Sequence, residues 1–227
     1  MFHSLASSSS GNLYTVSDGG TSLILEAGLP FPKLQKALKY NLTGYAGCFI
    51  THQHADHAQA AQELARRGMD IYCHPDTAKA LGIEAEATAM LPGCVQRIGS
   101  LLVQAIETRH DVPSVGYLIY SIQSREKLLV ALDTCYLPNR FEGLTEIAVE
   151  CNFSMAALTE SSIPGALKRR IMETHMSVET FIGMLEANDI SRVNKIYLLH
   201  MSNDRGDAEL FKTMVQEATG KPTEVCK

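Results

Sequence analysis

Four side chains that can bind metal fall within six positions, in the run Thr51-His52-Gln53-His54-Ala55-Asp56-His57. Imidazole and carboxylate groups are common ligands of divalent transition metals, and this density is typical of a metal site. In an extended segment, residues two apart point the same way, so His52 and His54 can converge on one ion. A turn after them would direct Asp56 and His57 toward a second point. The run therefore predicts two metals, and a polar turn with exposed histidines is the alternative interpretation.

Three further metal-capable residues each follow an apolar, strand-like stretch, and these are His110, Asp133 and His200. Because strand ends along one edge of a sheet lie together, we expect these side chains to meet the run at 51–57. The simplest assembly assigns His52, His54 and His110 to one ion and Asp56, His57 and His200 to the other, with Asp133 bridging both.

This ligand set predicts a cofactor of two divalent metal ions per chain, zinc or manganese, each with one coordination position left for water. Two such ions about 3.5–4 Å apart can share a hydroxide and polarise the oxygen of a bound ester or phosphate. The chemistry that the residues predict is hydrolysis.

The elements that must position these residues alternate between strands and helices. The run at 51–57 lies between a buried strand ending at 48–50 and a helix over 58–67. Further strands are predicted at 2–6, 13–16, 21–26, 70–73, 101–108, 115–122, 127–132, 145–149 and 194–199, and further helices at 32–40, 177–187 and 207–218. This alternation predicts the α/β fold class.

Length and composition narrow the protein class. With 227 residues and 45% hydrophobic residues, the chain can bury a sizeable core, and we expect one domain over residues 1–227. Neither a bilayer-spanning apolar run nor a signal peptide is evident, so we expect a cytoplasmic protein without a membrane partner. The cysteines lack CxxC spacing, which favours reduced thiols. The net charge of −5 argues against a broad basic surface for nucleic acid.

The densest positive charge in the chain is the run Lys168-Arg169-Arg170. Such a run is commonly a solvated helix face. Its closeness to Thr174-His175-Met176, which precedes a predicted helix start, raises the alternative that it borders the site. Cations at that place would favour a phosphate substrate over an uncharged carbonyl.

The H-x-H-x-D-H run with its downstream His, Asp and His resembles the metallo-β-lactamase-fold hydrolases. It is most similar to the WalJ/YycJ-like branch, whose opening resembles Leu5-Ala6-Ser7-Ser8-Ser9-Ser10-Gly11-Asn12. The similarity spans nearly the whole chain and includes residues 24–28, 111–117, 150–152, 167–171 and 174–177. It implies a four-layer αββα sandwich, with the metal site at one edge of two sheets and the ligands at the seven positions above. It also implies DNA exonuclease or phosphodiesterase activity.

The resemblance also implies roles outside the metal ligands. It makes His175 a catalytic or substrate-binding residue rather than a primary ligand, and a capping residue is the alternative. Asp56 is counted with His175 among the catalytic residues. Asn152, Lys168, Arg169 and Arg170 are the expected substrate-binding residues.

Two positions depart from the family pattern. The family usually has Asp where Glu26 stands, and the branch usually has His where Phe153 stands. The chain also lacks a long insert between Asp133 and His200, which argues against the β-CASP RNA-processing relatives.

We therefore expect an enzyme, a binuclear metal-dependent hydrolase that cleaves phosphodiester bonds. A DNA or RNA exonuclease is expected ahead of a phosphodiesterase for cyclic or other small nucleotides, and a lactone or thioester hydrolase comes third. A non-catalytic binding module would have lost ligands. The expected partner is a nucleic acid or nucleotide substrate, and the oligomeric state is left open, a homodimer included.

Overall fold

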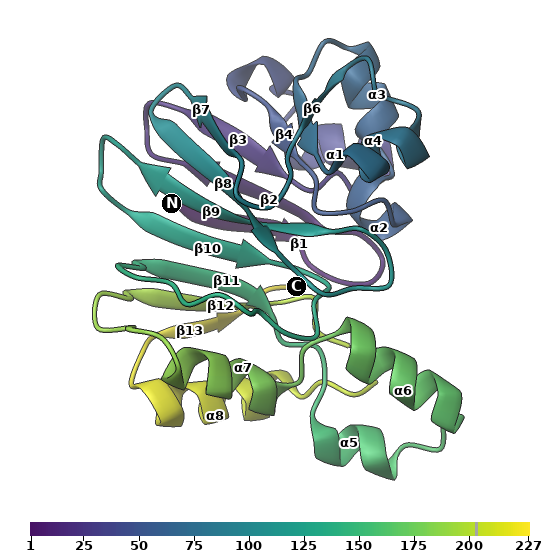
Figure 1. The fold of residues 1–227 in the computed structure, drawn as a ribbon, viewed down its shortest axis with the longest axis vertical. Coiled ribbons are helices and arrows are strands. Elements are labelled where there is room, and N and C mark those ends of the chain that lie inside the picture. Colours follow the sequence, from purple (N-terminus) through teal and green to yellow (C-terminus); the bar gives the residue numbers. More distant parts are fainter. Residues whose placement is uncertain (203) are drawn as a thin grey trace.

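The computed structural model describes residues 1–202 and 204–227, and its strands form two sheets packed face to face (Figure 1). The first sheet has six strands in the order β1 to β6. These are β1 (Phe2–Ala6), β2 (Leu13–Ser17), β3 (Ser22–Leu25), β4 (Cys48–Phe49), β5 (Ile71–Cys73) and β6 (Ala87–Ala89). The first three strands pair antiparallel, and β3 to β6 run parallel.

The second sheet has seven strands in the order β13-β12-β11-β10-β9-β8-β7. These are β7 (Val95–Ile98), β8 (Leu101–Glu107), β9 (Val115–Ser121), β10 (Lys127–Ala131), β11 (Glu146–Glu150), β12 (Lys195–Leu199) and β13 (Thr223–Val225). Strands β7 to β10 pair antiparallel, and β10 to β13 run parallel.

Helices cover the outer sides of both sheets (Figure 1). On the first sheet these are α1 (Phe31–Ala37), α2 (Ala55–Ala58), α3 (Ala61–Arg66) and α4 (Pro75–Leu81), with the short 3-10 helix η1 (Leu42–Gly44). On the second sheet they are α7 (Val178–Glu186) and α8 (Ala208–Thr219). The helices α5 (Met155–Glu160) and α6 (Gly165–Thr174) lie beside the edge at which the metal-capable residues meet. No described helix has the length and apolar character that a membrane crossing requires.

The core consists of three apolar layers, and strand periodicity assigns residues to them. Leu23 and Leu25 face the second sheet, whereas Ile24 between them packs with the helices of the first sheet. Leu128 likewise faces the first sheet, and its neighbour Leu129 clusters with residues of α7 and α8. Helix, sheet, sheet and helix thus form the four-layer αββα sandwich, which confirms the expected fold class.

Several element predictions need correction. The helix expected at 58–67 is two short helices, α2 and α3, and α2 already begins at Ala55. The helix expected at 32–40 ends at Ala37, because Lys39 and Tyr40 have left-handed backbone conformations. Strands β6, β7 and β13 and helix α5 were not expected, since these short segments carry too few residues for a clear hydrophobic period.

Candidate metal centre

The turn between β4 and α2 carries the central run of ligands. His54 is the N-cap of α2, while His52 and His57 are completely buried. Gly28 passes so close beneath this turn that a Cβ atom there would lie 1.7 Å from the main-chain oxygen of Asp56. The main-chain N–H of Asn12 also donates to that oxygen, at 2.8 Å. The backbone contacts therefore hold the turn in place independently of any ion.

The remaining members of the ligand set follow strands that end at the same edge. His110 follows β8, Asp133 follows β10 and His200 follows β12. Asp133 and His200 have φ angles of 46° and 48°. Residues other than glycine rarely adopt this left-handed backbone conformation. Backbone strain of this kind persists only where surrounding contacts impose it, and it is concentrated at functional sites.

The first group that could hold an ion consists of His52, His54, His110 and Asp133. Nδ1 of His54 lies 3.0 Å from Nε2 of His52 and 3.2 Å from Nε2 of His110. Zinc–nitrogen bonds of about 2.0–2.1 Å place two nitrogens of a tetrahedral site about 3.4 Å apart, close to the observed spacing. The donor set and its spacing therefore fit a divalent ion.

The second group consists of Asp56, His57, Asp133 and His200. Asp56 Oδ2 lies 3.2 Å from Nε2 of His200 and 3.4 Å from Nε2 of His57. Asp133 belongs to both groups, because its Oδ2 lies 3.7 Å from His52 and 3.4 Å from His57, and its Oδ1 lies 3.1 Å from His200. The structure thus brings the seven residues together as the sequence led us to expect. Their action as ligands stays a prediction.

The protonation of Asp133 and His52 suits metal binding, whereas that of His57 opposes it. Burial would raise the pKa of the Asp133 carboxyl, but His200 and His57 outweigh it and hold that pKa well below the usual value. Burial lowers the pKa of His52, which favours the neutral imidazole that a metal requires. Burial also works to lower the pKa of His57, but Asp133, Asp56 and Glu26 together raise it well above the usual value. Metal binding at His57 must therefore release a proton.

A set of neighbours orients the ligand rings. Glu26 Oε2 lies 3.4 Å from Nδ1 of His57, and the main-chain N–H of Thr51 donates to Glu26 Oε1. Nδ1 of His110 lies 3.1 Å from the carbonyl oxygen of Thr174. Groups of this kind fix ring orientation and raise ligand basicity. The longer Glu26 therefore still contacts the histidine of the metal turn.

Asn152 was expected to bind substrate. Its Nδ2 donates to the carbonyl oxygen of His200 at 2.7 Å, and the side chain is buried. The contact shows that Asn152 supports the strand end that carries His200. Direct contact with substrate stays a prediction.

His175 follows α6 and lies beside both ligand groups. Its Nδ1 is 3.0 Å from Oε2 of the buried Glu150, and its ring stacks on that of His200 with centroids 5.5 Å apart. Burial would lower the pKa of His175, but the Glu150 carboxylate outweighs burial and raises it to about 9. Asp133, Glu150, His175 and His200 also form a third group that could hold an ion. It shares Asp133 and His200 with the second group.

Of the three expected basic residues, Arg170 lies at the mouth of the site. The mouth is a cavity of about 220 Å³, and Leu167 and Ile171 of α6 line it together with Arg170. Nη2 of Arg170 is 2.9 Å from Asp111 Oδ2. Lys168 instead donates to the carbonyl oxygen of Thr159, and Arg169 is exposed and does not line the mouth. Substrate contact by these residues stays untested.

Sequence reasoning assigned no role to Asp111, Glu150 or Phe153. Asp111 Oδ1 lies 3.1 Å from Nε2 of His110. Its place next to that histidine in the sequence could have indicated that it lies at the site. Glu150 closes β11 as Asp133 follows β10, so the same strand-end rule could have indicated it. Phe153 is buried with Leu158 and Ile171, where it supports α5 and α6 against the sheet.

Comparisons with known proteins found a family model and relatives that match most of the chain. A family model described as the beta-lactamase superfamily domain matches residues 18–201. Exodeoxyribonuclease WalJ of Streptococcus pneumoniae serotype 2 is 30% identical over 233 residues, which cover 94% of this chain and 86% of the relative. Exodeoxyribonuclease YycJ of Bacillus anthracis is 27% identical, over 95% of this chain and 88% of the relative.

Solved structures show the same fold. The metallo-beta-lactamase fold protein YhfI of Bacillus subtilis superposes with a TM-score of 0.77 at 15% identity, covering 100% of this chain and 95% of that one. Yeast PDE1 superposes with a TM-score of 0.69 at 12% identity, covering 99% and 96%. A diphosphatase from the PhnP family gives a TM-score of 0.67 at 14% identity, covering 92% and 89%.

Proposed function

Because the chain belongs to the metallo-β-lactamase branch of the β-lactamase superfamily and is a metal-dependent hydrolase, we propose that it is a two-metal phosphodiesterase acting on nucleic-acid ends. The observation that carries the proposal is the pair of ligand groups that share Asp133 beside the His175–Glu150 pair. When bound, two divalent ions would polarise the phosphate and activate water for attack.

The residues of the chain have distinct tasks in this proposal. The seven residues of the two groups would hold the two ions, and Asp133 belongs to both groups. His175 lies at the mouth and is held by Glu150, so it can donate its proton to the leaving oxygen of the ester. Its raised pKa keeps that proton in place at neutral pH. Asp56, held between His57 and His200, orients the second group.

Charge favours a phosphate over a carbonyl substrate. Two dications exceed the charge of Asp56 and Asp133, so the loaded centre attracts an anion. Arg170 adds a guanidinium at the mouth, partly neutralised by Asp111. A carbonyl ester carries no charge and would gain little from either the loaded metal centre or Arg170.

The choice of a polymer rests on the relatives, which are named exodeoxyribonucleases and are matched over most of their length. A small nucleotide diester is the second candidate, because the mouth measures only about 220 Å³ and Arg170 is the only Lys or Arg side chain that lines it among the described residues. The mouth of the site therefore offers a long nucleic-acid strand few phosphate contacts close to the metals.

The test is a substrate panel on protein loaded with zinc or manganese. We expect stepwise shortening of end-labelled single-stranded DNA or RNA, with Asp133→Ala protein as the control for contaminating nucleases. Bis-p-nitrophenyl phosphate, cyclic mononucleotides and a lactone complete the panel. Activity confined to the lactone would defeat the proposal. Turnover of cyclic mononucleotides without shortening of polymer would establish the second candidate instead.

A further inference from the structure

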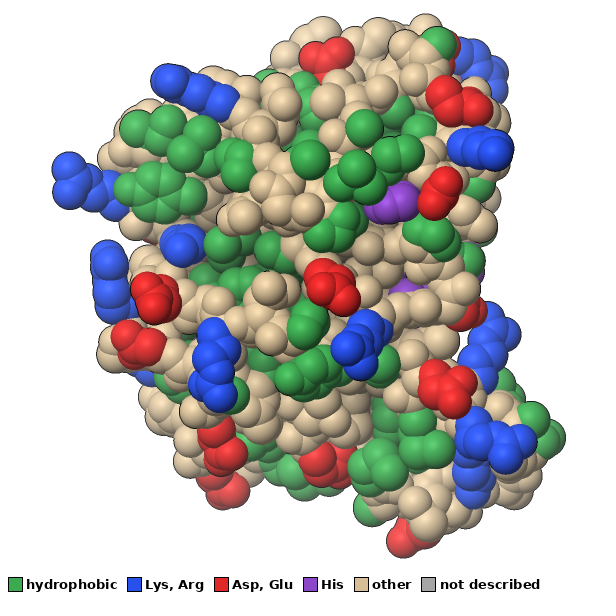
Figure 2. Space-filling view, viewed as in Figure 1, with side chains coloured by type: hydrophobic (Ala, Val, Ile, Leu, Met, Phe, Trp, Pro, Cys, Tyr) green, Lys and Arg blue, Asp and Glu red, His purple; other side chains and the backbone are tan. Residues whose placement is uncertain are grey.

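A cavity larger than the mouth of the metal site lies away from the metal centre, on the outer face of the second sheet. Its volume is about 640 Å³, against about 220 Å³ at the metal mouth. Helices α7 and α8 cover β11 to β13, but no helix of the described residues lies over the ends of β8 to β10 that are remote from the metals (Figure 1). Figure 2 shows hydrophobic side chains gathered on this face, with Lys and Arg side chains, and some Asp and Glu side chains, along its left border.

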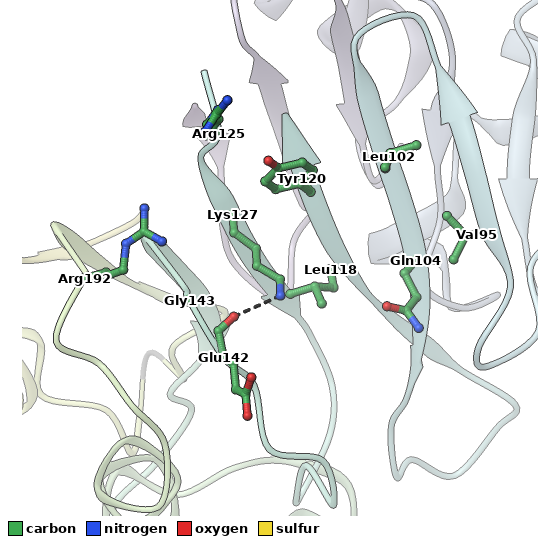
Figure 3. A pocket seen from close by; sticks show the side chains of 10 residues that line it. All are labelled: Val95, Leu102, Gln104, Leu118, Tyr120, Arg125, Lys127, Glu142, Gly143 and Arg192. Atoms are coloured by element: carbon green, nitrogen blue, oxygen red, sulfur yellow. Dashed lines mark hydrogen bonds between the residues drawn. The ribbon is translucent and has the colours of Figure 1, made fainter. Parts of the chain in front are cut away.

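The floor of this cavity is built by strand alternation. Leu102 on β8 and Leu118 and Tyr120 on β9 point outward, opposite to core residues such as Val103 and Ile119. These outward side chains are only half-buried, and Val95 beside them is 57% exposed. We call this surface, with its lining residues, the β8–β10 groove. Its lining comprises Val95, Leu102, Gln104, Leu118, Tyr120, Arg125, Lys127, Glu142, Gly143 and Arg192 (Figure 3).

Three cations lie together on one side of the groove, next to Tyr120 (Figure 3). Lys127 Nζ donates to the carbonyl oxygen of Glu142 at 2.9 Å. Among the described residues, no carboxylate comes within 4.0 Å of the charged nitrogens of Arg125, Lys127 or Arg192. Glu142 also lines the groove, so its ionisable lining residues carry a net positive charge of three cations against one carboxylate, in a chain of net charge −5.

The geometry points to the β8–β10 groove as a docking surface for the trailing part of a single-stranded nucleic acid whose end occupies the metal centre. Tyr120 offers a ring on which a base stacks, and the three cations offer contacts to phosphates. Gln104 supplies a donor and an acceptor for base edges. This inference rests on the proposed function, because it assigns a second contact to the same substrate.

The open shape of the groove favours a strand over a free nucleotide. Small-ligand pockets usually bury most of the ligand surface, whereas Val95 and both arginines of this groove are themselves exposed. A mononucleotide here would keep one face in water. A nucleic-acid strand can bind through several contacts along its length, so each single contact can be weak.

The distance between the groove and the metal centre is short enough for one nucleic-acid strand to contact both. Val115, at the other end of β9, donates its N–H to the carbonyl oxygen of Thr51 beside the metal turn, at 3.1 Å. Tyr120 lies five positions further along β9, which corresponds to about 17 Å at ~3.4 Å per residue. Single-strand binding sites on OB folds, for comparison, span about 4–16 nucleotides.

A second aromatic and cationic pair lies next to the metal ligands. The guanidinium of Arg109 lies 5.7 Å from the ring centroid of Tyr136, which is 47% exposed. The segment 134–144 leads from there to the groove, and Leu137 and Phe141 within it pack in the same apolar cluster as Ile106 and Leu129. A strand that follows this segment would meet aromatic rings and cations at both ends.

The first test measures binding without cleavage. A fluorescent dT 20-mer is titrated with each protein in the presence of a metal chelator, which prevents cleavage. The proteins are wild type, the triple groove variant Arg125→Glu, Lys127→Glu, Arg192→Glu, and the triple control variant Lys33→Glu, Lys36→Glu, Lys79→Glu. The control changes the net charge equally, at exposed positions on α1 and α4. We expect the groove variant to bind at least about ten-fold more weakly and with a smaller salt slope, by about 0.7 per lost phosphate contact. Equal binding by groove variant and control would overturn the inference.

Tyr120 provides an independent test of base stacking. Tyr120→Ala is expected to weaken binding of the 20-mer about ten-fold but to leave binding of an abasic strand of equal length unchanged, whereas Tyr120→Phe keeps wild-type affinity. Equal losses with both strands would mean that the ring is structural. Thermal unfolding of each variant checks the fold. A glutamate-rich peptide serves as the competing ligand, and selective loss of peptide binding in the triple variant would assign the groove to an acidic protein instead.

Cleavage separates this inference from the proposed function. With metal, the groove variant is expected to hydrolyse a dinucleotide, which is too short to reach the groove, at the wild-type rate, and the 20-mer more slowly at limiting substrate. If wild type cleaves neither, the proposed function fails while the binding results still stand. If wild type and variant shorten the 20-mer equally, the proposed function stands and the groove inference fails.

Discussion

At the scale of single residues, Asp133 combines burial with a strained backbone and a central place among the expected ligands. It is buried, has a φ angle of 46°, and lies in every group that could hold an ion. Its Oδ1 has no hydrogen-bond partner among the described residues. A strained and incompletely satisfied carboxylate is costly to bury, which is expected where a cation is to be bound.

Replacing Asp133 by Ala is expected to lower the occupancy of both metals, because both groups lose an oxygen. Elemental analysis of the purified variant measures the metal content. The matched control is His74→Ala, since His74 accepts a hydrogen bond from the Asp76 N–H as the N-cap of α4 and belongs to no ligand group. Retention of two ions by the Asp133 variant would contradict the bridging assignment.

Replacing His175 by Ala is expected to reduce turnover about 10²–10⁴-fold without loss of metal, if His175 protonates the leaving oxygen. Glu150→Gln should reduce turnover less, because it weakens the contact that holds His175 in place. Rates on an activated ester such as bis-p-nitrophenyl phosphate are expected to fall least, since its leaving group needs little protonation. A His175 variant with wild-type turnover would restrict this residue to a structural role.

At the scale of elements, the metal turn depends on the strands and loops beneath it. The ends of β3 and β4, the loop at Asn12 and the start of α2 meet there, with main-chain hydrogen bonds from Ala27 and Asn12 to the turn. The close approach at Gly28 leaves no room for a side chain. The ligands are therefore positioned by backbone packing.

Gly28→Ala is expected to destabilise the protein by at least about 3 kcal/mol and to lower metal content, because its Cβ would overlap the Asp56 carbonyl. Gly183→Ala is the matched control, since Gly183 lies within α7 with open space around its Cβ position. The control should gain about 0.5–1 kcal/mol from helix propensity. Urea unfolding of both variants measures the difference, and a neutral Gly28 variant would refute the close approach.

Asp18 links the β2–β3 turn to the second sheet and gives a prediction about pH. Slight burial works against its ionisation, but hydrogen bonds from the Thr21 N–H, Ser121, Ser100 and the Gly20 N–H lower its pKa to about 2. A carboxyl whose pKa is lower when folded contributes stability above its unfolded pKa of 3.8, and loses that contribution as the pH falls toward 2.

Asp18→Asn is expected to cost about 1 kcal/mol at pH 6, after allowance for solvent screening, with the difference from wild type shrinking between pH 4 and about 2. Urea unfolding at pH 6, 4 and 3 provides the comparison. A difference that stays constant over this range would mean that the charge of Asp18 contributes nothing.

At the scale of the whole molecule, the ligand set connects both sheets. His52 and His57 follow the first sheet, whereas His110, Asp133 and His200 follow strands of the second. An ion bound between them stabilises the folded state only, by an amount that grows with its concentration. Metal binding should therefore be visible as global stability.

Removal of metal by a chelator is expected to lower the thermal midpoint by several degrees, and added zinc or manganese should restore it. The Asp133→Ala protein should show a smaller response, because it holds less metal. Calorimetry with and without chelator measures both. An unchanged midpoint in wild type would indicate that the ions do not link the two sheets.

Much of this protein was determined by local sequence. The α/β alternation, the strand-to-helix turn that carries residues 52–57, and the strand-end positions of His110, Asp133 and His200 agree with the structure. The four-layer class, which the family resemblance implied, agrees with it as well. Local patterns suffice here because a turn between a strand and a helix, and a polar residue after an apolar strand, are properties of short segments. The single domain over residues 1–227 stays a prediction.

Other features were decided only by the tertiary structure, because they join residues from distant segments. The pairing of His175 with Glu150 spans 25 positions, and that of Arg170 with Asp111 spans 59. The orientation of Lys168 toward α5 depends on how two helices pack, which charge patterning does not encode. The β8–β10 groove likewise exists because α7 and α8 cover one half of the second sheet and leave the other half uncovered, and only the packed arrangement of helices on strands determines that.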